Sequence, residues 1–407
     1  MIPTILPIVV LLAIVASLVA YGLVEFHNHQ RILATIPLRI QINGTRGKSS
    51  VTRLVAAGLR AGNIRTFAKT TGTAPRVIDA EGKDHIIHRL RKASIGEHIR
   101  LMRFFAREKP QAVVMECMAV QPQYQWIAEQ QMVKSHIGVI TNVRPDHLDK
   151  MGATEEDIAR SMGNTIPGNG RFVTADERYH PLYTKLAGRR NSTCHLSDEQ
   201  RISRADLNRF AYLEHPQNVA LALDVCEMAG VKRQTALDGM VKVHPDLGAL
   251  IVWRLKFGPT RLSFINSMAA NDPVSTLNIW RMLIDRYPVE GDICVFLNTR
   301  EDRLYRTKQL LQLTMEEIKP QRLIVRGNNV STTIRHLRHY SPLTKVDKFG
   351  LDADHDAVIA AMQQLPEDSL IFAIGNQVGA GQEIVDRLRD YRTKHTRQTS
   401  SGDSTND

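Results

Sequence analysis

One segment, from Leu38 to Gly62, constrains the fold more than any other part of the sequence. It begins with the strand-like residues L-R-I-Q-I, continues with the glycine-containing string N-G-T-R-G-K-S, and ends with a helical pattern from Ser50 to Ala61 that Gly62 closes. A strand, a glycine-rich loop and a helix in this order form a βα unit, which is the building block of parallel sheets. The sequence therefore predicts an α/β fold with a mostly parallel sheet.

The string between strand and helix is a candidate phosphate-binding loop. Backbone N–H groups and the start of a helix can surround phosphates there, while the Lys48 ammonium meets the β and γ oxygens and the Ser49 hydroxyl binds Mg²⁺. The match to G-x-x-x-x-G-K-[ST] is incomplete, because Ile42 stands where the first glycine is expected and the nearest glycine is Gly44. Its place between a strand and a helix nevertheless favours nucleotide binding. The predicted ATP contacts in this loop are Asn43, Gly44, Thr45, Arg46, Gly47, Lys48, Ser49 and Ser50.

Apolar strands recur further along the chain, and each is followed by polar residues. They are Ala112–Met115 before Glu116, Ile137–Ile140 before Thr141 and Asn142, and Arg171–Thr174 before Asp176. Ligands of parallel α/β sheets bind at the carboxyl ends of the strands. We therefore expect these polar residues to converge on one crevice.

Two of these strand ends carry candidate catalytic groups. A carboxylate such as Glu116 just past a buried strand is either a Mg²⁺ ligand or a salt-bridged structural residue. The loop T-N-V-R-P-D-H-L-D-K-M-G, from Thr141 to Gly152, holds His147 between two carboxylates. That arrangement suits a metal ligand as well as a loop with ordinary Asx turns. Asp146 and Asp149 are candidates for a general base.

The length of the chain suggests two or three domains. Residues 36–248 form the first predicted α/β domain, which ends in the Pro- and Gly-containing stretch V-H-P-D-L-G-A-L after a helical run from Pro216 to Gly239. Residues 249–390 form a second, smaller α/β domain, and the polar tail 394–407 is expected to be disordered. The strands predicted in the second domain are Ile293–Leu297, Arg322–Val325 and Leu370–Ile374.

The amino-terminal residues have no charge from Met1 to Val24. A helix of this length crosses the roughly 30 Å hydrocarbon core of a bilayer, so residues 1–26 are predicted to be a single transmembrane anchor. A cleaved signal peptide is the alternative, but no Lys or Arg precedes the apolar run, which is long for such a peptide. Basic residues follow the run, among them Arg31 and Arg39, and they place the domains on the cytoplasmic face of the cell membrane.

The chain has a formal charge of +11, and basic residues are concentrated between Arg89 and Lys109. A basic segment suits anionic lipid, a nucleotide or an acidic polymer, although Arg100, Arg103 and Arg107 also fit the solvated side of an amphipathic helix. No aromatic interleaving or nucleic-acid motif accompanies the charge, so no nucleic-acid partner is expected. The four cysteines are scattered, which argues against a disulfide framework or a zinc ribbon.

Taken together, six motifs occur in the order seen in the Mur ligase superfamily, which the chain resembles from residue 36 to about residue 385. They are the phosphate loop, T-T-G-T-A-P at 70–75, E-C-M-A-V-Q-P at 116–122, the loop at 141–152, E-H-P-Q-N-V-A-L-A-L at 214–223 and N-S-M-A-A-N-D-P-V-S-T at 266–276. Within the superfamily the chain is most similar to the CapB/PgsB family, the membrane-bound ligase subunit of poly-γ-glutamate synthase. Two features favour this family over others in the superfamily. Muramoyl ligases place a nucleotide-sugar domain ahead of the phosphate loop, and folylpolyglutamate synthases lack an apolar amino-terminal helix.

The resemblance implies an ATP- and Mg²⁺-dependent ligase that adds glutamate to a growing polyglutamate chain through an acyl phosphate, with other membrane subunits of a synthase and export complex as partners. Lys48, Glu116 and His147 would be the catalytic set. Ser49 would join Glu116 and His147 as a metal ligand. By the same resemblance, Asn218 would face adenine and Asn271 with Asp272 would complete the ATP site. Thr73 and Arg76 are the expected substrate contacts.

The chain also departs from the muramoyl ligases. Ser161 stands where they carry a carbamylated lysine, so a carbamate-bridged second metal is doubtful. The arginine of their domain junction is missing, and Arg261, Arg300 and Arg303 are candidates for its role. Three alternative functions remain at this point: a folate- or cyanophycin-type ligase, a membrane-tethered P-loop NTPase, and a nucleotide-binding scaffold without turnover.

Overall fold

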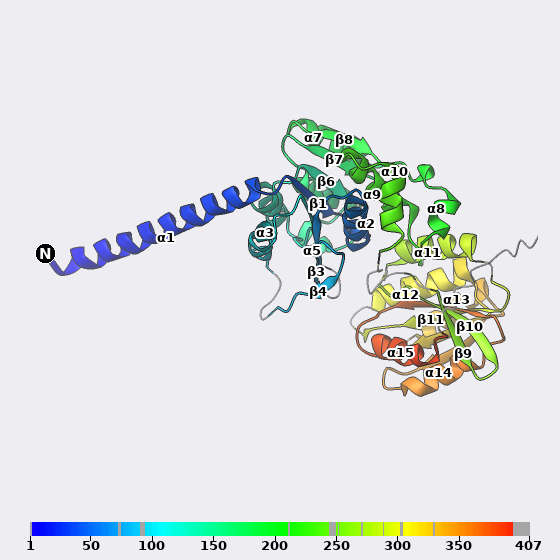
Figure 1. Cartoon of the computed structure of the whole chain (residues 1–407). Helices are drawn as coiled ribbons and strands as arrows, with labels where there is room; N and C mark the ends of the chain where they lie inside the picture. The colour runs from blue at the N-terminus through cyan, green and yellow to red at the C-terminus, as the bar shows by residue number, and fades with distance from the viewer. Residues whose placement is uncertain are drawn as a thin grey trace, which may run out of the picture. The chain divides into compact units, whose positions relative to one another are not determined.

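The structure is a computed structural model that describes residues 2–71, 75–89, 94–210, 212–243, 250, 252–269, 272–287, 289–301, 304–328 and 330–393. The chain divides into two compact units, Met1–Leu247 and Gly248–Asp407. Each unit contains its own mostly parallel sheet with helices packed on it (Figure 1). The predicted α/β class is therefore confirmed. The predicted tail, 394–407, lies outside the described residues.

Within its described residues, the first unit has an eight-stranded sheet of spatial order β4-β3-β2-β5-β1-β6-β7-β8. Neighbouring strands are parallel, except that β3 is antiparallel to both β2 and β4. The strand β1, which precedes the glycine-containing loop, therefore lies between β5 and β6. The strands are β1 (Leu38–Asn43), β2 (Thr66–Thr70), β3 (Arg76–Ile78), β4 (Asp84–Ile86), β5 (Ala112–Glu116), β6 (Ile137–Ile140), β7 (Arg171–Thr174) and β8 (Thr193–Leu196).

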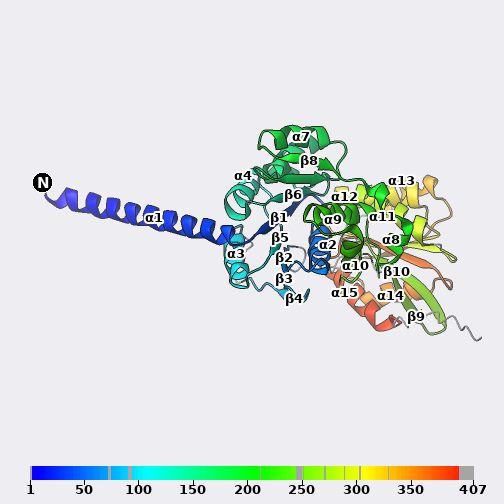
Figure 2. The same ribbon diagram turned by 45° about the horizontal axis from the view of Figure 1, so that its top comes forward.

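Helices cover this sheet. Figure 2 shows α2, α9 and α10 gathered together, and these three helices contact one another. The helices after the amino-terminal one are α2 (Lys48–Ala61), α3 (Glu97–Arg107), α4 (Pro122–Ile127), the π-helical turn η1 (Ala128–Val133), α5 (Leu148–Met151), α6 (Glu155–Met162), α7 (His180–Gly188), α8 (Arg204–Asn208), α9 (Pro216–Met228) and α10 (Arg233–Met240). The short turns η2 (Gly163–Thr165) and η3 (Glu199–Arg201) complete the unit.

The helical run predicted from Pro216 to Gly239 is wrong as a single helix. It is two helices, because the chain leaves the helical path at Gly230, whose φ of 85° lies in the left-handed region that glycine adopts readily. The predicted start at Ser50 is also corrected, since α2 begins at Lys48.

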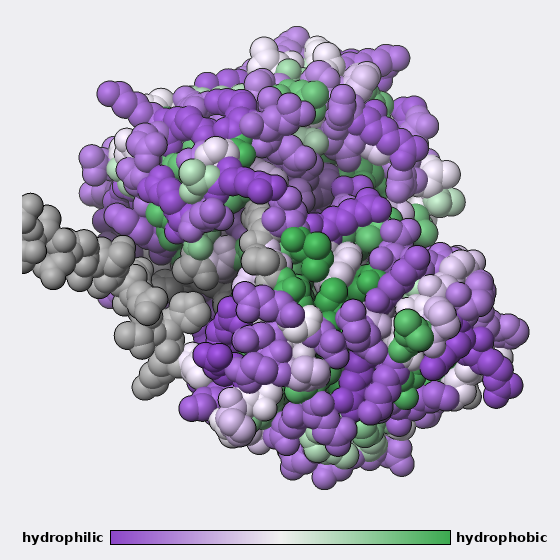
Figure 3. All heavy atoms as spheres, turned by 90° about the vertical axis from the view of Figure 1, so that its right-hand side faces the viewer, coloured by the Kyte–Doolittle hydropathy of each residue, from purple (hydrophilic) through white to green (hydrophobic). Residues whose placement is uncertain are grey.

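The amino-terminal segment is one continuous helix, α1 (Ile2–Ala34), which runs past the predicted end at residue 26 (Figure 1). Residues Pro7–Ala34 are long and apolar enough to cross a membrane. Side chains such as Leu11 and Leu18 are more than 60% exposed. By contrast, hydrophilic residues predominate on the face that Figure 3 shows.

The last turns of α1 pack on the first unit. Leu33 and Ile36 are buried in a cluster with Phe105 of α3 and Val113 of β5. A ring nitrogen of His29, Nε2, donates a hydrogen bond to the Met132 carbonyl in η1 at 2.8 Å. The Arg39 guanidinium of β1 donates to the carbonyls of Leu33 and Ile36 at 2.6 and 2.8 Å. The end of α1 is thus fixed to β1 and η1.

The second unit has a six-stranded sheet in its described residues, with spatial order β13-β12-β11-β14-β10-β9. Only the β9–β10 pair is antiparallel among the strand pairs described there. Its core gathers Phe264, Phe296 and Ile371 from the sheet with Met362 and Ile384 from the helices. The strands are β9 (Val252–Phe257), β10 (Thr260–Asn266), β11 (Ile293–Asn298), β12 (Arg322–Arg326), β13 (Lys345–Phe349) and β14 (Leu370–Gly375). The helices are α11 (Pro273–Arg286), α12 (Leu304–Leu313), η5 (Thr314–Ile318), α13 (Ser331–Leu337), η6 (Arg338–Tyr340), α14 (His355–Gln363), α15 (Ala380–Leu388) and η7 (Arg389–Tyr391).

A buried carboxyl group in η1 makes the stability of the first unit depend on pH. Burial raises the pKa of Glu129 to about 7, although the backbone N–H and hydroxyl of Ser135 donate to it at 2.9 Å. Because the pKa in the folded state lies above the ordinary value of 4.5 for this group, its contribution to stability is fully present below about pH 4.5 and is lost as the pH rises through about 7.

We predict that Glu129→Gln removes this dependence, because the amide does not ionise. The stability of the wild type relative to the variant should fall by up to about 3 kcal/mol between pH 4.5 and pH 8. Denaturant midpoints measured across this range test the prediction, with Glu156→Gln on the exposed side of α6 as the control. Parallel profiles for the wild type and Glu129→Gln would contradict it.

Candidate active site

The loop between β1 and α2 is held by the end of the neighbouring strand β6. The Thr45 N–H donates to the Asn142 carbonyl at 2.9 Å, and the Arg46 N–H donates to the Asn142 side-chain oxygen at 3.1 Å. The hydroxyl of Thr141 in turn donates to the Arg46 carbonyl at 2.6 Å. The conformation of the loop therefore depends on β6 as much as on its own sequence.

Two glycines of this loop occupy positions that a side chain cannot share. Gly44 has a φ of 133°, and a Cβ atom there would lie 2.0 Å from the hydroxyl oxygen of Thr141. Gly47 has a φ of 83°, and its Cβ would lie 2.5 Å from the side-chain oxygen of Asn218. The incomplete motif thus keeps its glycines where the backbone needs them.

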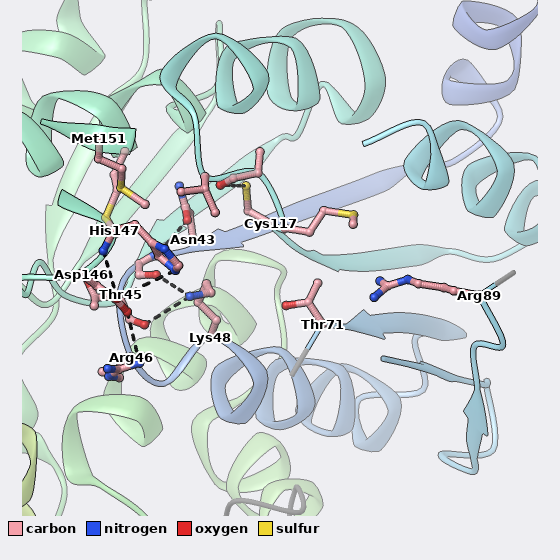
Figure 4. A pocket seen from close by; sticks show the side chains of 15 residues that line it. Asn43, Thr45, Arg46, Lys48, Thr71, Arg89, Cys117, Asp146, His147 and Met151 are labelled. Atoms are coloured by element: carbon pink, nitrogen blue, oxygen red, sulfur yellow. Dashed lines mark hydrogen bonds and ion pairs between the residues drawn. The ribbon is translucent and has the colours of Figure 1, made fainter. Parts of the chain in front are cut away.

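Lys48 is the first residue of α2, and its ammonium group lies over the loop. It donates to the carbonyl of Gly44 at 2.7 Å and approaches that of Thr45 at 3.3 Å (Figure 4). The start of a helix carries a partial positive charge and unpaired N–H groups. A cation, the start of a helix and a glycine loop therefore meet at one place, as phosphate binding requires.

Glu116 connects this loop to the end of β2. It is 2% exposed, and its Oε2 accepts hydrogen bonds from the Ser49 hydroxyl at 2.8 Å and from the Thr71 N–H at 2.7 Å. The Thr71 hydroxyl donates to the other carboxylate oxygen. A buried carboxylate is costly unless its oxygens are satisfied, and these bonds satisfy both oxygens.

Ser49 and Glu116 fit a divalent cation by donor chemistry, because both offer hard oxygen atoms beside the phosphate loop. Among the described residues, no three His, Cys, Asp or Glu side chains are grouped as a metal site. Mg²⁺ commonly takes one or two carboxylates together with phosphate and water, so a full protein cage is not needed.

A pocket of about 300 Å³ opens beside the loop. It is lined by Asn43 to Arg46 and Lys48 of the loop, by Cys117 to Val120 after β5, and by Asp146 and His147 after β6. Thr71 and Arg89 line it as well, from the segments after β2 and β4 (Figure 4). The segments after β5 and β6 meet the loop here, as predicted, but the predicted residues Glu116, Thr141, Asn142 and Asp176 are not themselves among the lining residues. Asp176, after β7, accepts a hydrogen bond from the Val143 N–H at 2.8 Å.

His147 lines this pocket at the start of α5, with a φ of 48° in the left-handed region. Such backbone conformations in non-glycine residues gather at functional sites. Its Nε2 is 3.9 Å from Asp146, which pairs with Arg46 at 3.3 Å. Asp149 is 72% exposed, pairs with Lys150 and is not among the lining residues. Of the two candidate bases, Asp146 is therefore the one in the pocket.

The remaining predicted ATP residues lie in several places. Asn218, in the first turn of α9, donates to Glu214 at 2.8 Å and lies against Gly47, while Ser50 is half-buried in the first turn of α2. Asp272 belongs to the second unit and caps α11 by accepting a hydrogen bond from the Ser275 N–H at 2.8 Å. Asn271 lies outside the described residues.

The predicted substrate residues have equally different positions. Arg76 is 3.6 Å from Asp84 and does not line the pocket. Thr73, like Arg303, lies outside the described residues, and Arg261 pairs with Glu367 at 2.8 Å. Ser161, at the position of the carbamylated lysine, is buried and accepts a hydrogen bond from Gln125 at 3.1 Å.

A network of buried charged side chains, which the sequence did not predict, lies beside the pocket. Lys69 of β2 is 0% exposed, and its Nζ lies 3.2 Å from Glu97 of α3. Arg89 donates to the same carboxylate from Nε at 2.7 Å and from Nη2 at 3.0 Å. Burial lowers the pKa of Lys69, whereas the negative charges of Glu97 and Glu116 act to raise it. The sequence signal was weak, because Glu97 reads as an ordinary helix start and Lys69 as a solvated strand residue.

Two family models match the chain. The Mur ligase middle domain covers residues 42–237, and the poly-γ-glutamate synthase CapB C-terminal domain covers residues 252–391. A capsule biosynthesis protein CapB of Bacillus anthracis is 34% identical over 92% of this chain and 81% of its own length. The chain belongs to the CapB family. Another member, the PGA synthase CapB of Bacillus subtilis strain 168, is 33% identical over 93% of this chain and 97% of its own length.

Solved structures of more distant proteins share the fold of this CapB-family chain. MurF from Acinetobacter baumannii has a TM-score of 0.66 at 14% identity, covering 91% of this chain and 80% of that one. Escherichia coli FolC, solved in complex with DHPP and ADP, has a TM-score of 0.60 at 14% identity, and the match covers 89% of this chain and 92% of that one. At such identities the comparison establishes the fold alone.

We predict that Gly47→Ala destabilises this CapB-family chain by about 1–2 kcal/mol, because alanine is strained at positive φ and its methyl group meets Asn218. The measurement is the thermal unfolding midpoint of the full chain in detergent. Gly188→Ala is the matched control, since a Cβ there meets nothing within 4 Å. Equal midpoints for the two variants would show that the loop adopts another conformation.

Proposed function

We propose that this chain uses ATP to join glutamates through γ-amide bonds, by way of an acyl phosphate, and so synthesises poly-γ-glutamate. Membership of the CapB family carries the assignment to poly-γ-glutamate synthesis by an amide ligase. The finer mechanism is supported by Lys48 at the start of α2, which lines the pocket, and by the Ser49–Glu116 pair, whose chain neighbours Lys48 and Cys117 line it.

The proposed reaction has two steps, since a carboxylate is a poor electrophile for an amine. In the first step, a γ-carboxylate oxygen attacks the γ-phosphorus of ATP, the bond to the bridging oxygen breaks, and ADP leaves. In the second, the amine of a glutamate attacks the acyl carbon. Phosphate then leaves with one oxygen of the original carboxylate, and the attacking nitrogen gives up a proton.

Residues of the pocket supply the electrostatics of both steps. Lys48 and the N–H groups of the loop stabilise charge that develops on the γ-phosphoryl group. Asp146 is the proposed acceptor of the amine proton, because it lines the pocket. Ser49 and Glu116, with His147 as a third ligand, would hold a divalent cation, for which we propose Mg²⁺, and when bound it would neutralise phosphate charge.

The other predicted site residues complete the proposal. Asn218 would face adenine from α9, and Asn271 with Asp272 keep their predicted role as ATP contacts. Thr73 and Arg76 keep their predicted role as substrate contacts. These assignments rest on the motifs in which the residues occur.

We also propose that α1 anchors the chain in the cell membrane with both units on the cytoplasmic side. Basic residues such as Arg31 and Arg39 follow its apolar part, and the positive-inside bias favours that orientation. A polyanion made at the membrane needs a route across it, so small membrane subunits of a synthase and export complex are the expected partners.

The proposal predicts that ¹⁸O placed in the carboxylates of glutamate appears in the released phosphate. Membranes containing the full chain would be given ATP, Mg²⁺ and labelled glutamate, with the proposed membrane subunits co-expressed. Lys48→Ala should lower glutamate-dependent ADP release by about a hundredfold or more. Lys185→Ala, an exposed lysine of α7, is the control and should leave the rate unchanged.

Phosphate and γ-linked products would be analysed by mass. Labelled phosphate that disappears in Lys48→Ala supports an acyl-phosphate ligase. Unlabelled phosphate released at the same rate without glutamate would contradict the proposal and favour a membrane-tethered NTPase. ADP release that needs another acid, with label in phosphate only when that acid rather than glutamate carries the ¹⁸O, would identify a ligase of different specificity.

A further inference from the structure

The pocket beside the phosphate loop has two cationic ends. Among its described lining residues, Asp146 is the one acidic side chain, and it pairs with Arg46. Lys48 contacts backbone carbonyls at one end, where phosphate would bind. Arg89 lines the pocket away from the loop, and Figure 4 shows its guanidinium directed toward Thr71. The proposed ATP phosphates explain the first cation but not the second.

Arg89 is held in place by two hydrogen bonds to one carboxylate. Its Nε and Nη2 donate to Glu97, which is 5% exposed, whereas the side chain of Arg89 is 24% exposed. These bonds fix the plane of the guanidinium, and among the described residues none accepts a hydrogen bond from Nη1. An arginine fixed in this way can bind a further carboxylate with little loss of side-chain entropy.

Lys69 adds a second positive charge at this end of the pocket, where Glu97 and Glu116 are the carboxylates that interact with it. It is fully buried and shares Glu97 with Arg89, so two cations face one carboxylate. A buried lysine with an ion-pair partner lies in a region of low dielectric, where its charge acts over a longer distance than at the surface. The Lys69–Glu97–Arg89 group therefore has a net charge of about +1 when Lys69 is protonated.

The proposed reaction creates a need for such a charge. A γ-carboxylate must approach the γ-phosphate of ATP, and the two anions repel each other. In addition, the glutamate that carries this γ-carboxylate has an α-carboxylate of its own, which must be held while the first group reacts. A fixed arginine beside Thr71 could bind that second carboxylate and orient the reacting one.

We infer that Arg89, held by Glu97 and Lys69, binds the α-carboxylate of the glutamate whose γ-carboxylate is phosphorylated. This inference rests on the proposed function and adds a substrate contact to the same site. Arg89 would be a specificity residue for γ-linked glutamate chains.

The test measures binding, which does not depend on turnover. A fluorescein-labelled γ-linked glutamate pentamer is titrated with the full chain in detergent micelles, and its anisotropy gives the Kd. A second pentamer carries an amide in place of the terminal α-carboxylate. The proteins compared are the wild type, Arg89→Met, Arg89→Lys and Arg107→Met, the last being an exposed arginine at the end of α3.

The inference predicts that Arg89→Met weakens binding of the acid pentamer about tenfold to a hundredfold, the usual effect of losing one charge-assisted contact. Arg89→Lys should recover part of the loss. Arg107→Met should bind like the wild type. The wild type should bind the amidated pentamer as weakly as Arg89→Met binds the acid pentamer. The Kd of the amidated pentamer should be the same for the wild type and Arg89→Met. Binding of a fluorescent ATP analogue should be the same for all four proteins.

Other results would overturn the inference in distinguishable ways. If the wild type binds the pentamer and Arg89→Met binds it equally well, the inference is wrong and the proposed function stands. If Arg89→Met weakens binding of the ATP analogue and leaves binding of the pentamer unchanged, the arginine contacts the nucleotide. If the wild type binds the ATP analogue but neither pentamer, the proposed acceptor is wrong and the inference falls with it. Thermal midpoints within about 2 °C of the wild type establish that the variants are folded.

Discussion

The candidate site depends on three parallel strands that end at the same level of one sheet. β5, β1 and β6 are neighbours, and their ends supply Glu116, Asn43 and Thr141 in turn. Because the three chain segments leave the sheet together, the loop after β1 can take hydrogen bonds from the segment after β6. Glu116 reaches Ser49 from the other side. Neither set of contacts is available to the loop as an isolated peptide.

Buried charge is the second constraint on this region. The side chains of Lys69 and Glu97 are 0% and 5% exposed, and Glu116 is 2% exposed. Each of the three nevertheless has a polar partner. Removing one member of a buried pair leaves an uncompensated charge and typically costs about 3–5 kcal/mol. These groups are therefore costly to rearrange, which gives the pocket a fixed electrostatic pattern. That pattern distinguishes the proposed phosphate end near Lys48 from a second cationic end at Arg89.

The helix α1 and the site are joined by a short piece of chain. Only residues 35–37 separate α1 from β1, and the Arg39 guanidinium bonds to carbonyls at the end of the helix. A membrane anchor in α1 would therefore hold the phosphate loop near the bilayer surface. The proposed product is a polyanion, and with the proposed orientation it would be made close to the membrane that it has to cross.

The sequence by itself determined the α/β class, the apolar helix, the central strands and the glycine-containing loop between strand and helix, because buried parallel strands and glycine loops have strong local patterns. The sequence pattern did not reveal the helix break at Gly230, because the helical periodicity continues beyond that residue. Only the tertiary structure decided that Lys69 and Arg89 share Glu97, and that Asp146 rather than Asp149 faces the pocket. The physical reason is that these pairings join segments far apart in the chain, and the charge of a side chain does not reveal whether the fold buries it.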